Sequence, residues 1–156
     1  MSEKDVEDLI CRFPGLFGVP EDVRLFARQH VYPTGKVADI VFRSLPSSQS
    51  IVFEIKDAAL SEAHLDQLED YVKCERAETG HTDVSGVLVG RITIRRVDLE
   101  ESARCRSTSI RCLYRDFDYS TSVLVCRSCK HPYWPVHRQC PRCHSEDSNL
   151  ILFENQ

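Results

Sequence analysis

The spacing of apolar residues along the chain predicts helices that alternate with strands. In three segments, apolar side chains recur every three or four positions, as they do on the buried face of a helix. Pro14-Gly15 ends the first of these helices, and Ser61 can cap the second. The three predicted helices cover residues 3–13, 61–77 and 96–106, and the last has the weakest pattern.

Five further segments are predicted to be strands, because they are short, apolar and separated by turn residues. The run between Gly86 and Gly90 is apolar throughout, which is typical of a buried central strand. The order α-β-β-β-α-β-α-β predicts an α/β fold in which helices pack on the faces of one mixed sheet. The predicted strands are 24–31, 37–43, 51–56, 86–90 and 110–114.

The chain has 156 residues, enough for one core domain and a small appendage. We expect a core domain over 1–115, a linker over 116–122, and a cysteine-containing module over 123–156. The N-terminus is acidic and lacks the apolar region of a signal peptide, and no run approaches the roughly 20 apolar residues that span a bilayer. We therefore expect a cytoplasmic protein with no membrane partner.

The net charge of −4 is unevenly distributed along the chain. Residues 1–90 contain 9 Lys and Arg against 16 Asp and Glu, whereas residues 91–156 contain 11 against 8. The acidic half could hold a cation. The basic half could face phosphates, because Lys and Arg contacts supply most of the sequence-independent affinity for nucleic acids.

Charged residues interrupt two of the predicted apolar strands. Because strand side chains alternate between faces, Glu54 and Lys56 share one face of the strand 51–56. A lone aspartate, Asp39, lies inside the apolar strand one hairpin earlier. Such charges are costly to bury unless they are paired or bind a metal, and two carboxylates on neighbouring strands would suit Mg²⁺ or Mn²⁺. The alternative is an ordinary surface ion pair.

The helix that follows these strands adds two polar residues, Gln67 and Tyr71. They are four positions apart and therefore lie on one helical face. That face is placed so that their polar groups can point along the cleft rather than into the core. This arrangement favours a site over a simple surface ion pair.

Together, Asp39, Glu54-x-Lys56 and Gln67-x-x-x-Tyr71 resemble the PD-(D/E)XK nuclease superfamily, including the Q-x-x-x-Y element of RecB-like members. The chain is more closely similar to the catalytic domain of NucS/EndoMS-type endonucleases, over residues 3–115. The resemblance implies a restriction-endonuclease-like fold and metal-dependent hydrolysis of DNA. The segments that follow the order of that family are Arg28-Gln29, Thr34-Gly35, Asp39-Ile40, 51–56, 67–72 and 87–89.

The resemblance also implies a role for each residue of the site. Asp39, Glu54 and the carbonyl group of Ile55 would hold Mg²⁺ or Mn²⁺, which lowers the pKa of a bound water and neutralises charge on the scissile phosphate. Lys56 would hold that water and stabilise the developing negative charge. Gln67 and Tyr71 would orient the lysine, the metal shell or a phosphate.

Residues of the first helix and first strand would complete this site. An acidic residue of the first helix is usual in the superfamily, and we expect Glu3 rather than Glu7 because Glu3 lies nearer the apolar face of the helix. The alternative is that both are solvated acids at a helix start. Arg28 and Gln29 are candidates for phosphate or metal-shell contacts, or else an exposed strand pair. His64, one turn before Gln67, is expected to be a bystander rather than a general base.

The chain departs from the family pattern in three ways. The turn before Asp39 is one residue longer than expected, and Asp57 follows the lysine where a basic or small residue is more usual. The N-terminal DNA-binding and dimerising domain of the family has no counterpart in this sequence. Mismatch recognition is therefore not carried over, and we expect assistance from a homodimer or a partner protein.

Four of the eight cysteines form two C-x-x-C pairs near the C-terminus, ten residues apart. Four thiolates suit tetrahedral Zn²⁺, and the segment resembles rubredoxin-like zinc ribbons, with a closed structural site. Two disulfides or a redox pair are the alternatives, and His131, His137 and His144 are surplus as ligands. The expected zinc ligands are Cys126, Cys129, Cys140 and Cys143, whereas Cys11, Cys74, Cys105 and Cys112 are expected to be structural thiols.

The zinc ribbon carries basic and aromatic residues that suggest a contact surface. Tyr133 or Trp134 could stack on a base, or both could form an apolar plug. DNA contact, protein docking and stabilisation alone all remain open as roles for the ribbon. The residues that could contact phosphates are Arg127, Lys130, Arg138 and Arg142.

These observations predict an Mg²⁺- or Mn²⁺-dependent DNA endonuclease that carries a structural Zn²⁺. The alternative is a non-catalytic adaptor that uses the same fold to bind nucleic acid or protein. Asp39, Glu54 and Lys56 favour the enzyme, because a protein that only binds has no need of all three. RNA stays open as the substrate.

Overall fold

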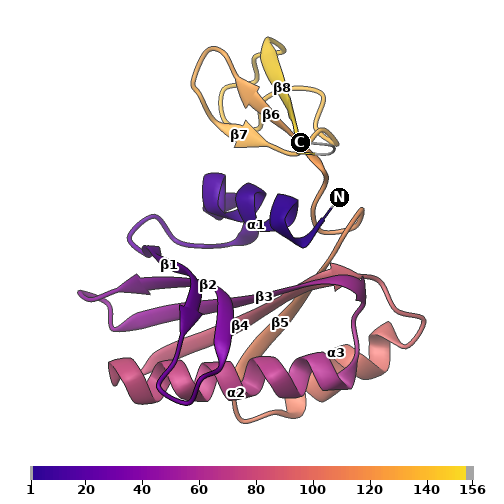
Figure 1. Ribbon diagram of the computed structural model, residues 1–156. Helices are drawn as coiled ribbons and strands as arrows, with labels where there is room; N and C mark the ends of the chain where they lie inside the picture. The colour runs from indigo at the N-terminus through magenta and orange to yellow at the C-terminus, as the bar shows by residue number, and fades with distance from the viewer. Residues whose placement is uncertain (1, 154–156) are drawn as a thin grey trace.

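The computed structural model describes residues 2–153 and contains the predicted α/β core (Figure 1). One mixed sheet of five strands has the spatial order β1-β2-β3-β4-β5. Its strands are β1 (Arg24–Val31), β2 (Val37–Ser44), β3 (Gln49–Ala59), β4 (Asp83–Arg91) and β5 (Ser109–Tyr114). The helices are α1 (Glu3–Arg12), α2 (Glu62–Thr79) and α3 (Arg96–Cys105). This confirms the predicted fold class and element order.

The sheet is antiparallel on one side and parallel on the other. Strands β1, β2 and β3 pair as consecutive antiparallel neighbours, whereas β3, β4 and β5 are parallel. Parallel neighbours need a crossover connection, and α2 and α3 supply the two crossovers. The carboxyl ends of β3, β4 and β5 therefore meet at one edge of the sheet.

Helices cover both faces of the sheet and bury two apolar cores (Figure 1). Under α1, Phe53 and Ile55 of β3 pack with Leu9 and Ile10 of the helix. Under α2 and α3, Val52 packs with apolar residues of both helices. The alternation predicted for 51–56 is therefore correct: odd-numbered residues face α1, and even-numbered residues face α2.

Some element boundaries differ from the prediction for local reasons. Strand β3 continues to Ala59, because Ala59 pairs with Arg91 after a break in the register that begins at Ile55. A short 3-10 helix, η1 (Pro14–Phe17), follows α1 and was not predicted. It ends at Gly18, whose φ of 80° is accessible mainly to glycine.

The cysteine module forms a second, three-stranded antiparallel sheet with the order β7-β6-β8. Its strands are β6 (Ser122–Cys126), β7 (Pro132–Tyr133) and β8 (Ser148–Leu152). Strand β8, which begins at Ser148, closes this sheet. The buried Phe153 follows it. We refer to residues 122–153 as the zinc ribbon.

The zinc ribbon lies on α1, on the side away from the sheet (Figure 1). The ring of Phe17 packs edge-on against Trp134 of the ribbon, with 5.7 Å between ring centroids, and also contacts Tyr119. Phe13 contacts Phe153 in the same way at 6.2 Å. Tyr119, within the predicted linker 116–122, is thus part of one core shared by both modules. The division into 1–115, 116–122 and 123–156 stays a prediction.

No helix within residues 2–153 is both long and apolar enough to cross a membrane. The longest, α2, carries charged residues along its length.

Replacing Phe17 with alanine should destabilise the whole protein, because its buried ring joins α1, the connecting segment and the ribbon. We expect the free energy of unfolding, measured by urea denaturation, to fall by about 3–5 kcal/mol. Val136→Ala, at an exposed apolar position of the ribbon, is the control and should change it by less than about 0.5 kcal/mol. A loss below about 1 kcal/mol for Phe17→Ala would show that the two modules do not share a core.

Candidate active site and metal centres

Strands β2 and β3 bring the predicted carboxylates and lysine together. Asp39 Oδ2 accepts a hydrogen bond of 2.7 Å from the backbone N–H of Ile55, across the β2–β3 ladder. Lys56 Nζ lies 3.2 Å from Glu54 Oε1 on the same strand. The geometry therefore joins three of the predicted residues in one cluster, although their catalytic roles stay predictions.

The two carboxylates of this cluster interact unfavourably in the absence of a cation. Burial raises the pKa of Glu54 to about 8, and the nearby charge of Asp39 adds to this effect against the opposing influence of Lys56. Burial also raises the pKa of Asp39, which the hydrogen bond from Ile55 partly offsets. A divalent cation would reverse both shifts, because it favours the ionised carboxylates.

One oxygen of Glu54 accepts no hydrogen bond from the residues that the structure describes. Glu54 Oε2 is buried and accepts no hydrogen bond, while Oε1 faces Lys56. Buried polar atoms in native proteins are nearly always satisfied, so an orphaned carboxylate oxygen needs an explanation. Two carboxylates and an unused oxygen fit a hard cation such as Mg²⁺ or Mn²⁺.

Helix α2 places Gln67 and Tyr71 along the same cluster. Gln67 Nε2 donates a hydrogen bond of 2.7 Å to the Tyr71 hydroxyl. The pKa of Tyr71 is raised by burial first and by the negative charge of Glu54 next, which places the phenol near that carboxylate. The structure thus brings the helical pair to the strand cluster.

A second set of contacts ties Asp39 to α1 through β1. Gln29 Nε2 lies 3.2 Å from Asp39 Oδ1 and 3.1 Å from Glu7 Oε2, so one amide bridges two carboxylates. Gln29 does so from a left-handed backbone with φ of 50°, a conformation that costs a non-glycine residue on the order of 1–3 kcal/mol. Such strain at a cluster of charges is common at functional sites.

Arg28 pairs with acidic residues of α1, and Glu3 of the same helix contacts the backbone of β3. Arg28 forms ion pairs of 2.6 Å with both Glu7 and Asp8, so it ties β1 to α1. Glu3 Oε1 instead accepts a hydrogen bond of 3.0 Å from the Asp57 backbone N–H. Glu7, not Glu3, is therefore the helix acid linked to Asp39.

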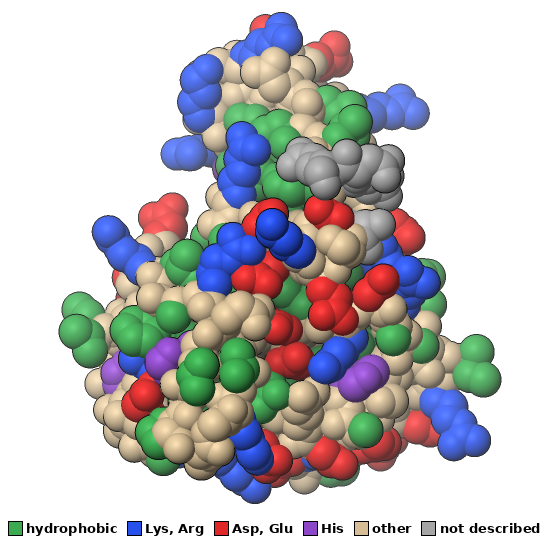
Figure 2. Space-filling model, in the orientation of Figure 1, with side chains coloured by type: hydrophobic (Ala, Val, Ile, Leu, Met, Phe, Trp, Pro, Cys, Tyr) green, Lys and Arg blue, Asp and Glu red, His purple; other side chains and the backbone are tan. Residues whose placement is uncertain are grey.

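His64 borders the cluster from the first turn of α2. Its Nδ1 accepts a hydrogen bond of 3.1 Å from the Ser61 backbone N–H, which places the proton of the neutral ring on Nε2. Burial, and then the charge of Lys56, lowers the pKa of His64. Figure 2 shows the wider setting: acidic side chains gather on one face, between the zinc ribbon and the helices below the sheet.

The four cysteines of the zinc ribbon form a separate cluster. Their sulfur atoms all lie within 4.8 Å of one another, with 3.5 Å between Cys126 and Cys143 and between Cys129 and Cys140. A disulfide requires about 2.05 Å, whereas tetrahedral Zn–S bonds of about 2.3 Å place sulfurs about 3.8 Å apart. The backbone N–H of Cys129 lowers the pKa of Cys126 to about 6, which favours the thiolate. The cluster therefore fits a structural Zn²⁺.

A third group of potential ligands is already neutralised by the protein. His30, Glu75 and Glu78 also lie within 4.8 Å of one another. Arg43 donates hydrogen bonds of 2.8 Å to each oxygen of the fully buried Glu75 and also contacts Glu78. The guanidinium of Arg43 already pairs with both carboxylates, so this group is an ion-pair network that joins β1, β2 and α2.

The basic residues predicted on the zinc ribbon fall into two groups. Arg127 is paired with Asp147 at 3.0 Å and with Asn149. Lys130, Arg138 and Arg142 are exposed and have no side-chain partner within residues 2–153. Tyr133 is buried and Trp134 packs on Phe17, so both aromatic side chains pack within the protein.

Three solved chains share this fold, whereas no protein-family model and no curated protein matches the sequence. A complex of EndoMS with double-stranded DNA is 24% identical over 72% of this chain, with a TM-score of 0.54. A repair endonuclease from Pyrococcus abyssi is 23% identical over 73%, with a TM-score of 0.56. EndoMS without ligand is 26% identical over 73%, with a TM-score of 0.51.

This similarity confirms the predicted resemblance of the fold to EndoMS-type repair endonucleases. The chain covers 44% of the DNA-bound EndoMS chain and 47% of each of the other two, so it spans less than half of their length.

The purified protein should contain one Zn²⁺ per chain, because four sulfur atoms converge in the zinc ribbon. We expect Cys126→Ser to lower the zinc content measured by elemental mass spectrometry several-fold, since the loss of a ligand opens the site. Cys105→Ser changes an exposed thiol on α3 and should leave one zinc per chain. Full zinc content in Cys126→Ser would contradict the assignment.

The affinity for Mn²⁺, measured by calorimetry, should increase with pH. Because the raised pKa of Glu54 is about 8, metal binding below that pH must displace a proton. The dissociation constant should fall by up to about tenfold per pH unit between 6 and 8 and then level off. Glu54→Gln should bind more weakly and lose this slope, whereas Asp70→Asn, at a surface ion pair, should retain it. A constant affinity in the unaltered protein would contradict this prediction.

Proposed function

We propose that this protein is an Mg²⁺- or Mn²⁺-dependent endonuclease that hydrolyses phosphodiester bonds in DNA. The observation that carries the proposal is the buried Glu54 Oε2, which accepts no hydrogen bond from residues 2–153, beside Asp39 and Lys56. Buried acids without a partner are expected where a ligand satisfies them. A non-catalytic adaptor would gain nothing from such an atom.

The residues of the site divide the work as follows. Asp39, Glu54 and the Ile55 carbonyl would hold the divalent ion, which supplies a bound water of lowered pKa and neutralises charge on the scissile phosphate. Lys56 donates a hydrogen bond to the attacking water or to a phosphate oxygen and stabilises the charge that develops there. The Gln67–Tyr71 pair orients the groups around Glu54 from the α2 side.

Positioning of Asp39 depends on three elements. The N–H of Ile55 fixes one carboxylate oxygen, and Gln29 fixes the other. Glu7 holds the Gln29 amide from α1. We therefore assign Gln29 and Glu7 as positioning residues. Glu3, which was expected to complete the site, instead lies at its edge, where it contacts the backbone of Asp57.

DNA is the preferred substrate because EndoMS, which shares the fold, has been solved with double-stranded DNA. The exposed Lys130, Arg138 and Arg142 would contact phosphates or a partner from the zinc ribbon. A homodimer or partner protein would complete the DNA-binding surface of a chain that spans less than half of these relatives.

Asp39→Asn and Lys56→Ala should each lower the rate of DNA cleavage by at least about 100-fold in Mn²⁺, because each removes a charge from the reacting groups. The measurement is single-turnover cleavage of labelled single-stranded, duplex and branched DNA. Lys36→Ala removes a lysine that pairs with Asp70 on the surface, and its cleavage rate should be unchanged.

Retained activity in both variants would exclude the proposed site. Cleavage of RNA without cleavage of DNA would correct the substrate class. Binding of nucleic acid with no cleavage in any metal would favour the adaptor.

A further inference from the structure

Two arginines meet one aspartate at the carboxyl edge of the parallel strands. Asp57 Oδ1 accepts hydrogen bonds from Arg91 at 2.7 Å and from Arg115 at 3.3 Å. Arg91 is the last residue of β4, and Arg115 follows β5 directly. Because β3, β4 and β5 run parallel, their ends bring these three side chains together one residue beyond Lys56.

The break in the β3 register explains how Asp57 reaches both arginines. Pairing between β3 and β4 is regular as far as Ile55 and resumes only at Ala59. Irregularities of this kind re-aim side chains and often lie next to active sites. Asp57, which departs from the usual motif, thus has a structural role, because it fixes two guanidinium groups at the ends of the parallel strands.

Both guanidinium groups keep donors for a ligand. Each has five N–H donors in a planar fork, yet the described residues provide only the single Asp57 oxygen to each. The Arg115 side chain is only 14% exposed, whereas that of Arg91 is 53% exposed. The planar forks of the two guanidinium groups match the geometry of phosphate oxygens.

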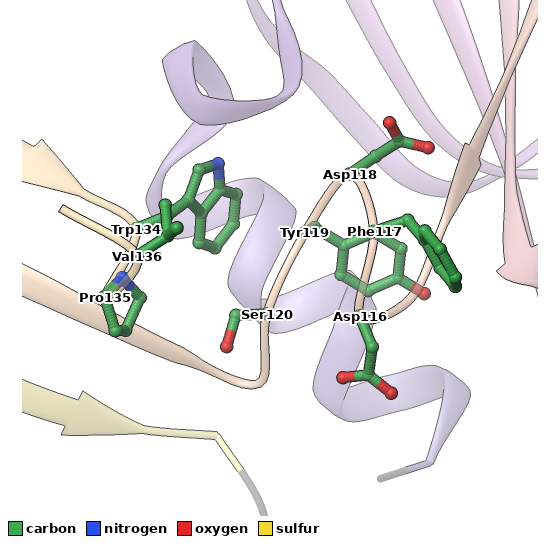
Figure 3. A pocket seen from close by; sticks show the side chains of 8 residues that line it. All are labelled: Asp116, Phe117, Asp118, Tyr119, Ser120, Trp134, Pro135 and Val136. Carbon is green, nitrogen blue, oxygen red and sulfur yellow. The ribbon is translucent and has the colours of Figure 1, made fainter.

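These arginines line a hollow with an aromatic wall. The hollow has a volume of about 520 Å³ and is lined by Arg91, Ile92, Arg115, Asp116, Phe117 and Thr121. The Phe117 ring is 65% exposed. Figure 3 shows a neighbouring pocket that Phe117 also lines, between the connecting loop and Trp134; there the Phe117 ring lies on the opposite side of the loop from Trp134. The hollow therefore combines a cationic wall with an exposed aromatic face.

The loop that carries Phe117 is held by several hydrogen bonds. The backbone N–H groups of Phe117 and Asp118 both donate to the Tyr114 carbonyl, and the Tyr114 N–H donates to Asp118 Oδ2. The Asp116 N–H donates to the Tyr119 carbonyl, and the Tyr119 ring is buried in the shared core. An aromatic ring on a fixed loop loses little conformational freedom when it binds a ligand.

We propose that this hollow binds an unpaired nucleotide of a DNA strand. The phosphate lies on Arg91 and Arg115, and the base stacks on Phe117. A base that stacks on a protein ring must be free of its neighbours, so the hollow takes a single-stranded nucleotide. This inference rests on the proposed endonuclease function, because that function makes DNA the ligand.

Binding of a fluorescein-labelled single-stranded oligonucleotide of about 12 nucleotides tests the subsite separately from catalysis. Fluorescence anisotropy is measured with the full chain, without added Mg²⁺ or Mn²⁺. Phe117→Ala should weaken binding about tenfold, and Phe117→Leu should not restore it, because stacking needs an aromatic ring. Arg91→Ala should weaken binding and lower the slope of log Kd against log salt by about 0.7, as expected for one lost phosphate contact.

Two further variants separate the subsite from general effects on folding or charge. Asp116→Asn removes a negative charge that also lines the hollow, so it should strengthen binding. Arg104→Ala removes an exposed arginine of α3 that lies outside the hollow and should leave the affinity unchanged.

The outcomes distinguish this inference from the proposed function. Unaltered affinity in Arg91→Ala and Phe117→Ala, with cleavage still lost in Asp39→Asn, would overturn the subsite and leave the nuclease standing. Equal affinity for an unbroken duplex and for the single strand would also overturn it. Weakened binding in both variants, in a protein that cleaves nothing in any metal, would support the subsite and count against the nuclease.

Discussion

Placing Glu54 in the interior beside Asp39 costs free energy that the protein alone does not recover. Lys56 lies beside one oxygen, but the other is buried and accepts no hydrogen bond from the described part of the chain, and burial raises the pKa of the carboxyl group. The neighbouring elements position or cover the residues of this cluster. Strand β2 supplies Asp39, and helix α2 places Tyr71 near Glu54. The fold thus supports an arrangement that is unfavourable by itself and that a divalent cation would stabilise.

The support for Asp39 shows how far such a cluster depends on its surroundings. One amide, Gln29, bridges Asp39 to Glu7, and it does so from a backbone conformation that β-strands rarely contain. Arg28 then ties the same acid to β1 with an ion pair. Helix α1 therefore has two roles: it covers the apolar face of the sheet, and it fixes the orientation of a carboxylate on the second strand.

The sequence predicted the parts of this arrangement that depend on local periodicity. Alternation along 51–56 placed Glu54 and Lys56 on the face opposite Phe53, and helical spacing placed Gln67 beside Tyr71, as the structure has them. The C-x-x-C spacing likewise identified the four clustered cysteines. These features follow from two or three neighbouring residues, so they can be recognised without knowledge of the fold.

Contacts between distant segments could not be predicted in this way. The choice between Glu3 and Glu7 depends on how α1 crosses the sheet, which periodicity does not specify. The pairing of Asp57 with Arg91 and Arg115 requires the parallel strand order and a break in register, and neither has a local signal. Nor did the sequence indicate that Tyr119, in an apparent linker, would be buried.

The common core of Phe17, Tyr119 and Trp134 has a consequence for how the molecule loses its structure. A module attached by a free tether would melt independently of its neighbour. Here the same aromatic rings belong to both modules, so thiol oxidation or metal starvation that opens the four-cysteine cluster would also expose Phe13 and Phe17, which follow α1 and contact the ribbon. Sensitivity to the redox state and metal supply of the surroundings would thereby extend to Glu7, and through it to the acidic face.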